Sequence, residues 1–293
     1  MKKSIISMIS LTFLLAGCGH HNQAANQTHV KLGDVMHQDQ HISYLVKKED
    51  NPTPTKDSVV TAYIVTQNGK QTVYSSDQAS DRTLGDFKDK SDKTIIDMAK
   101  KDDRAAFQYE KKEMKKEIQK LVNRKQLKDH DGFKLKASDF QTQPETAIKH
   151  LDNMTYQAPQ PQKVRIQVTE DETGNHSTRE AFAIHPQGIG NTKQPEDVGD
   201  IEQVMTESGI SNALNENKGT IDYLTTDKHP NHHMIAFDIA GGTADVYDKK
   251  YAFISQNDGE LNLVTPVGKK TKGIQFDAPD SRYVQDQKDR KSV

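Results

Sequence analysis

The chain has 293 residues, of which 33% are hydrophobic and 28% charged, with no tryptophan, a net charge of −2 at pH 7 and a mean hydropathy of −0.86. A protein that binds nucleic acid usually has an excess of basic residues, so this nearly neutral balance predicts no nucleic-acid partner. The length is enough for one large domain or two ordinary ones, and two are expected here.

The first 17 residues have the layout of a secretory signal. Lys2 and Lys3 precede an uncharged apolar run over residues 4–16, and polar residues follow soon after Gly17. A helix that spans a bilayer needs about 20 predominantly apolar residues, so this run is too short to remain as an anchor. We therefore expect residues 1–17 to be removed as a signal peptide.

The four residues Leu15, Ala16, Gly17 and Cys18 resemble the lipobox of bacterial lipoproteins. The resemblance implies that the Cys18 thiol is alkylated with diacylglycerol and that cleavage leaves Cys18 as the lipidated N-terminus. Two acyl chains give stable anchoring, so the expected location is the extracytoplasmic face of the cell membrane. The alternative is an ordinary signal peptide followed by a free cysteine.

Cys18 is the only cysteine in the chain. No intramolecular disulfide, cysteine metal cluster or thiol catalyst is therefore expected downstream. The usage of Lys, Asp and Gln is similar to that of surface lipoproteins of low-GC Gram-positive bacteria.

The mature chain is expected to begin with a flexible tether. Residues 18–40 carry few apolar groups and no helical or strand period, which is typical of a polar spacer. An α+β domain is expected over residues 41–157. Within it, β-rich runs on either side of Asn68-Gly69 predict a hairpin over residues 59–75.

Two helices are expected after this hairpin. Ser91 is a candidate N-cap for a helix over residues 92–101, and apolar residues at a spacing of 3.6 predict a longer helix over residues 103–127. The other faces of the longer helix carry Lys and Glu. Such a face could rest on anionic lipid or a wall polymer, or it could simply be solvated.

The polar stretch with Pro159 and Pro161 predicts a stiff linker, and a β-rich domain is expected over residues 163–284 with a loose tail over residues 285–293. A second hairpin is expected around Gly174. One helix is then predicted over residues 198–207, and four strands over residues 234–239, 243–247, 251–256 and 261–264. Together these elements predict an α+β protein with an N-terminal hairpin and helices and a C-terminal antiparallel sandwich or open barrel.

His229, His232 and His233 form the densest group of possible metal ligands after the tether. Zinc binds three or four converging ligands, and manganese is also considered for this group. Pro230 predicts a loop, however, so the three imidazoles need not converge. A polar turn rich in histidine is the simpler interpretation, in which case no cofactor is bound.

Residues 237–246 resemble a phosphate-binding loop of the actin-like ATPase family, in which paired glycines let backbone N–H groups approach phosphate. The earlier matching loop and the adenosine motif of that family are missing from this chain. A strand, a tight turn at Gly241-Gly242 and a second strand account for the same letters.

The sequence shows no convincing nucleophile or carboxylate motif, so no catalytic residue is assigned. The favoured interpretation is a lipid-anchored, non-enzymatic module that binds a cell-wall polymer or a surface protein. The alternatives are a metal- or solute-binding lipoprotein that uses the histidines, and an envelope hydrolase whose site assembles only in the folded chain.

Overall fold

The computed structural model describes residues 23–49, 51–76, 80–122, 126–128, 134–136, 142–184 and 233–285. The helices are η1 (Ala24–Asn26), α1 (Leu32–Met36), η2 (Leu84–Phe87), α2 (Asp92–Val122) and α4 (Thr142–Asn153). The strands are β1 (His29–Lys31), β2 (His41–Lys47), β3 (Val60–Gln67), β4 (Lys70–Ser75), β5 (Gln126–Lys128), β6 (Lys134–Lys136), β7 (Gln162–Lys163), β8 (Ile166–Glu170), β9 (Ser177–Ile184), β10 (His233–Phe237), β11 (Ile239–Val246), β12 (Lys249–Ser255), β13 (Leu261–Val267) and β14 (Gly273–Gln275).

A seven-stranded antiparallel sheet, in the order β11-β12-β13-β2-β3-β4-β7, forms the centre of the molecule. β2 pairs directly with β13, with Leu45 opposite Leu263. Strands from both expected domains therefore belong to one sheet, so the division into domains 41–157 and 163–284 is wrong for the described residues. The proline stretch leads into β7, which pairs with the edge of β4.

The two predicted hairpins are present. β3 and β4 are joined at Asn68 and Gly69, whose φ angles of 51° and 71° are those of a two-residue type I′ turn. β8 and β9 form the second hairpin, with Gly174 at a φ of 71° in the connection. Glycine and asparagine adopt positive φ at little cost, which explains why these turns could be recognised from sequence.

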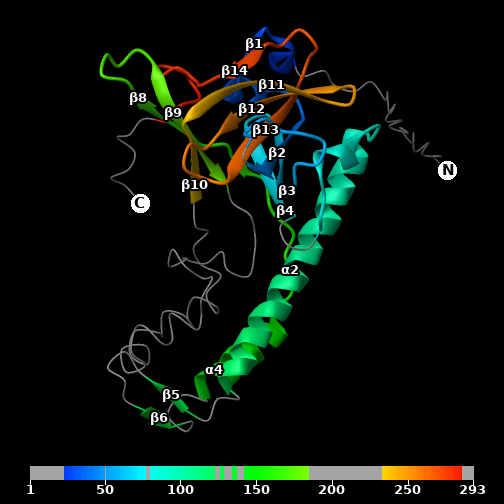
Figure 1. Cartoon of the computed structure of the whole chain (residues 1–293), viewed down its shortest axis with the longest axis vertical. Coiled ribbons are helices and arrows are strands. Elements are labelled where there is room, and N and C mark those ends of the chain that lie inside the picture. Colours follow the sequence, from blue (N-terminus) through cyan, green and yellow to red (C-terminus); the bar gives the residue numbers. More distant parts are fainter. Residues whose placement is uncertain are drawn as a thin grey trace, which may run out of the picture.

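One face of the large sheet is covered by a smaller sheet, in the order β10-β9-β8, together with the parallel pair β1-β14 and the N-terminal helices (Figure 1). Phe182 of β9 and Phe237 of β10 lie 6.3 Å apart between their ring centres in this layer. The described sheets are antiparallel and open apart from the β1-β14 pair. This confirms the α+β class and its sandwich form.

The other face of the large sheet packs against η2 and the first part of α2. Tyr44 stacks on Phe87 with ring centres 4.9 Å apart, and Ile95 and Ala99 of α2 are buried in the same cluster. Aromatic rings bury a large apolar area, so this cluster holds the start of α2 firmly on the sheet.

The prediction of a flexible tether is wrong for residues 23–40. Ala24, Val30 and Val35 are at most 1% exposed and belong to the sandwich core. β1 pairs with β14, so the partner of this segment lies more than 240 residues along the chain. Local composition therefore gave no sign of its burial.

A single helix, α2, replaces the two that the sequence predicts, and its 31 residues correspond to about 46 Å. Its part beyond Phe107 leaves the sandwich and runs beside α4, with β5 and β6 near its far end (Figure 1). We call α2 beyond Phe107, with α4 and the β5-β6 pair, the arm. Among the described helices, none is long and apolar enough to span a membrane.

Candidate functional site

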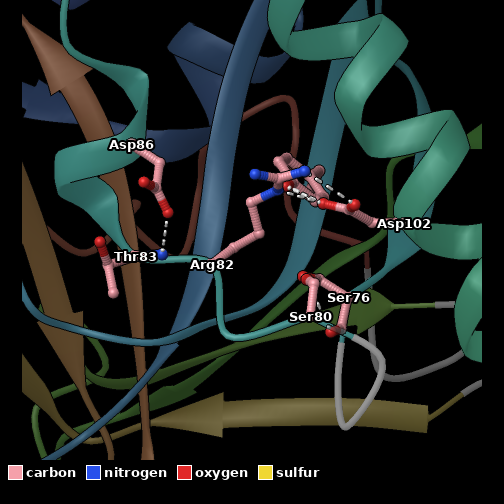
Figure 2. A network of polar contacts seen from close by, with 7 residues as sticks. Ser76, Ser80, Arg82, Thr83, Asp86 and Asp102 are labelled. Atoms are coloured by element: carbon pink, nitrogen blue, oxygen red, sulfur yellow. Dashed lines mark hydrogen bonds and ion pairs between the residues drawn. The ribbon is translucent and has the colours of Figure 1, made fainter.

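Two consecutive aspartates fasten α2 to the sheet at the point where the arm begins. Asp102 is 3% exposed and accepts hydrogen bonds from the Tyr63 hydroxyl at 2.7 Å and from the Arg82 Nε at 2.8 Å. A second bond from Arg82 Nη2 to Asp102 is 3.3 Å long. Figure 2 shows Arg82 pointing from its loop toward Asp102 on the helix.

Asp103, the second aspartate, is 1% exposed and binds a different part of the fold. Its carboxylate accepts the backbone N–H of Ser75 at 2.8 Å and the Tyr156 hydroxyl at 2.6 Å. Tyr156 follows α4, and its ring packs edge-on against Phe107 with centres 5.8 Å apart. Asp103 of α2 therefore binds both the end of β4 and the segment that follows α4.

The loop that carries Arg82 is fixed by local hydrogen bonds (Figure 2). Thr83 and Asp86 form a capping box at the start of η2, in which the Thr83 N–H donates to Asp86 at 2.9 Å. The hydroxyls of Ser76 and Ser80 lie 2.9 Å apart on the other side of Arg82. These bonds fix the loop so that the Arg82 guanidinium faces Asp102. We call Tyr63, Arg82, Asp102, Asp103 and Tyr156 the root cluster.

The root cluster is suited to holding the arm and poorly suited to catalysis. Burial, together with Asp102, raises the pKa of Tyr63, and burial raises the pKa of Tyr156, so both phenols stay protonated at neutral pH. The Asp102 carboxylate accepts three bonds from its two partners and is only 3% exposed, so a substrate cannot reach it.

A second polar group lies inside the sandwich and has the parts of a nucleophile with its base. The Nε2 of His41 lies 2.7 Å from the Thr265 hydroxyl, which lies 2.9 Å from the Ser43 hydroxyl. Ser43 and Thr265 are fully buried and His41 is 8% exposed. A substrate cannot reach these hydroxyls, so the group satisfies buried polar atoms between β2 and β13.

A buried carboxyl pair joins the C-terminal segment to α1 and β9. Asp277 accepts the Gly33 N–H at 2.8 Å, and the Asp277 N–H donates to Glu180 at 2.8 Å. Both side chains are 1% exposed, and Glu180 Oε1 has no hydrogen-bond partner among the described residues. Burial, and then the neighbouring Asp277, raise the pKa of Glu180, so one proton on this pair is favoured.

His41 should make the protein less stable in mild acid. Burial lowers the pKa of His41 from 6.5 to about 4, so the unfolded chain binds more protons between these values. The stability that the neutral imidazole contributes is complete above pH 6.5 and is lost as the pH falls toward 4, by about 3 kcal/mol in total. Urea unfolding across this range should show the loss in the wild type and not in His41→Gln.

The raised pKa of Glu180 acts in the opposite sense, because its stabilisation is greatest at low pH and is lost as the pH rises. Subtracting the unfolding free energy of His41→Gln from that of the wild type at each pH cancels this contribution, since Glu180 is present in both. Replacing the exposed His176 by Gln is the matched control and should leave the pH dependence unchanged. Equal slopes for wild type and His41→Gln would contradict the prediction.

Most of the sequence-predicted site residues lie outside the part of the chain that the structure describes. Cys18, His229, His232 and the helix expected over residues 198–207 lie outside the described residues. His233 is the first residue of β10, opposite Ile184 of β9. Within the described parts of the chain, no three His, Cys, Asp or Glu side chains are placed to hold a metal ion.

The turn expected at Gly241-Gly242 is wrong, because both glycines lie within β11 at a break in its register with β12. A Cβ at Gly241 would lie 2.2 Å from the Phe253 carbonyl oxygen, so close backbone approach requires glycine there. The bulge accounts for Gly241 without a phosphate, whereas a Cβ at Gly242 would meet no other atom within 4 Å.

Comparison with protein-family models, with curated proteins and with solved structures finds no match to this chain. Sequence reasoning missed the root cluster, whose members lie up to 93 positions apart in no recognisable motif. The consecutive aspartates Asp102 and Asp103, where the first predicted helix ends and the second begins, were its one visible signal.

Proposed function

We propose that the mature chain is a lipid-anchored extracytoplasmic protein that holds its arm away from the membrane to bind a cell-wall polymer or a surface protein, without catalysing a reaction. The lipobox at Leu15–Cys18 supports the anchor. The described fold begins at Gln23 with Ala24 already buried, so little chain separates Cys18 from the body of the protein.

The observation that carries the proposal is the placement of the arm. β1 and η1, which follow the anchor, lie at one end of the molecule, and α4 with the β5-β6 pair lies at the other (Figure 1). A helix that leaves its core forgoes apolar burial, which is the main source of helix stability in proteins. An exposed partner-binding surface gives a reason for extending α2 in this way.

Polar contacts join the two helices of the arm. Lys111 donates to the Met154 carbonyl at 2.8 Å, and Lys115 pairs with Asp152 at 2.6 Å. Tyr109 is 38% exposed on α2, with Lys112 exposed nearby on the same helix. Aromatic residues such as tyrosine are enriched at protein–protein interfaces, so Tyr109 is the residue of this surface that favours a protein partner.

Cys18→Ser should abolish lipid attachment in the native host. The serine hydroxyl is a far weaker nucleophile than a thiolate, so no thioether to diacylglycerol forms. Intact mass measurement should find diacylglycerol on the wild type and an unmodified chain in the variant. After cell fractionation, the wild type should be found with the membranes and the variant should not.

The exposed Thr178, replaced by alanine, is a control in which lipid attachment should persist. A wild-type chain with an unmodified Cys18 thiol would overturn the anchor. A chain that carries lipid but binds wall polymer and surface proteins equally well with and without residues 108–153 would overturn the role of the arm alone.

A further inference from the structure

The first residues of the fold are held by the turn between β13 and β14. Gly268 N–H donates to the Ala25 carbonyl at 2.9 Å, and Lys272 N–H donates to the Thr28 carbonyl at 2.7 Å. The buried Thr271 hydroxyl donates to the Gln27 carbonyl at 2.7 Å. The chain that comes from Cys18 therefore enters the protein directly against this turn.

The same turn carries three exposed lysines, Lys269, Lys270 and Lys272. None of their side chains forms an ion pair with another described residue. Lys250 of β12 adds a fourth cation nearby, because its ammonium donates to the Lys269 carbonyl at 3.1 Å. We call residues 268–272 the lysine turn.

Acidic groups near the lysine turn are fewer than its cations. Asp245 lies opposite Lys250 across the β11-β12 pair, and Asp248 lies in the connection between those strands. The side of the turn formed by residues 26–29 presents Asn, Gln, Thr and His, with no carboxylate. The surface beside the entering chain is therefore cationic at neutral pH.

The distance from the anchor to this surface is short. Cys18 and Gln23 are five residues apart, and a fully extended chain spans at most about 3.6 Å per residue, or roughly 18 Å in all. A lipid on Cys18 would keep the lysine turn within one or two Debye lengths of the bilayer surface, about 8–10 Å each at physiological salt. At such distances lysines are attracted to anionic headgroups.

We propose that the lysine turn binds the phosphate groups of anionic phospholipids in the membrane that holds Cys18. This inference rests on the proposed lipid anchor and adds the surface that faces the bilayer. Binding there orients the body with the N-terminal end toward the headgroups and the arm pointing outward. A single acyl chain gives marginal membrane binding, and a basic patch adds to it.

The test uses the sole cysteine of the mature chain from Cys18 onward, coupled chemically to one myristoyl-length maleimide chain. Partitioning is measured on vesicles of phosphatidylcholine and on vesicles of phosphatidylcholine and phosphatidylglycerol in equal parts. Replacing Lys269, Lys270 and Lys272 by Gln should weaken binding to the anionic vesicles on the order of 100-fold, since each lysine near such a surface contributes roughly fivefold. Binding to phosphatidylcholine should not change.

The matched control replaces Lys93, Lys100 and Lys101, exposed lysines of α2 that lie outside the arm, with Gln, which changes the net charge equally. Its binding should remain that of the wild type. Equal weakening in both variants, or none in the lysine-turn variant, overturns the proposal. Inorganic phosphate and sodium chloride at matched ionic strength should displace the protein equally, and selective displacement by phosphate would show a free-anion site instead.

Chemical coupling makes this outcome independent of the host's enzymes. An unmodified Cys18 in the host would overturn the proposed function while leaving the vesicle result to stand as a property of the turn. Confirmed lipid on Cys18 with no lysine dependence would overturn the inference and leave the anchor intact. Salt titration of the wild type tests whether the binding is electrostatic, because headgroup binding must weaken as salt rises.

Discussion

Removing residues 23–37 should abolish cooperative unfolding. This segment places Val30, Leu32, Val35 and Met36 in the sandwich core, each at most 1% exposed. Burial of such side chains contributes about 1.5–3 kcal/mol each, and their sum is comparable with the whole stability of a typical domain, about 5–15 kcal/mol. The strand partner of β14 would be lost as well.

Calorimetry and near-ultraviolet circular dichroism would measure this loss. The control keeps the segment and replaces two exposed residues in it, Gln27→Ala and His29→Ala, which should change the melting temperature little. A truncated chain that melts cooperatively near the wild-type temperature would show that residues 23–37 are dispensable. That result would restore the interpretation of this stretch as a tether.

Asp102→Ala should cost about 3–5 kcal/mol, because it leaves the Tyr63 hydroxyl and the Arg82 guanidinium without their shared acceptor. Arg82 keeps 28% of its side chain exposed and can be solvated in part, so the lower end of this range is expected. For a chain of this size the melting temperature should fall by roughly 10 °C.

A double-mutant cycle with Arg82→Ala would isolate the ion pair and should give a coupling energy of about 1–2 kcal/mol. Asp152→Ala is the matched control, since Asp152 pairs with Lys115 at 2.6 Å with half of its side chain exposed, and exposed pairs contribute less than about 1 kcal/mol. If Asp102→Ala destabilised the protein no more than Asp152→Ala, the root cluster would not be what holds α2.

Local signals predicted the parts of the fold that form between neighbours in sequence. Asn68-Gly69 indicated the β3-β4 hairpin because few residues accept the backbone angles of a type I′ turn. The helical spacing around Phe107 indicated a helix. The sequence predicted a break between two helices at residue 102, but the helix is continuous there. Asp102 and Asp103 are buried and have hydrogen-bond partners in the fold, so the helix does not need to end to expose them to solvent.

The elements that pair over long distances could not be predicted in this way. β1 has three residues, and nothing in them indicates β14 as a partner. The β2-β13 pairing likewise joins segments on opposite sides of the proline stretch, where two prolines among polar residues predicted a linker between domains. Composition describes a segment alone, whereas burial depends on what the rest of the chain brings to it.

The same limit applies to the candidate site. Tyr63, Arg82, Asp102 and Tyr156 come from a strand, a loop, a helix and the segment after another helix, so no spacing rule connects them. The lysine turn has a similar origin, since its relation to the chain's entry point arises from the closing of β14 onto β1.

The parallel pairing of β1 with β14 constrains the order in which parts of the chain can fold. In any synthesis or translocation that proceeds from the N-terminus, His29 emerges long before Gly273, its partner in the ladder. Closing so long a loop carries a high entropic cost, so this step comes late. The strand that is made first is therefore among the last to pair. In a nascent chain that stops short of residue 273, β1 has no β14 with which to form its native pair.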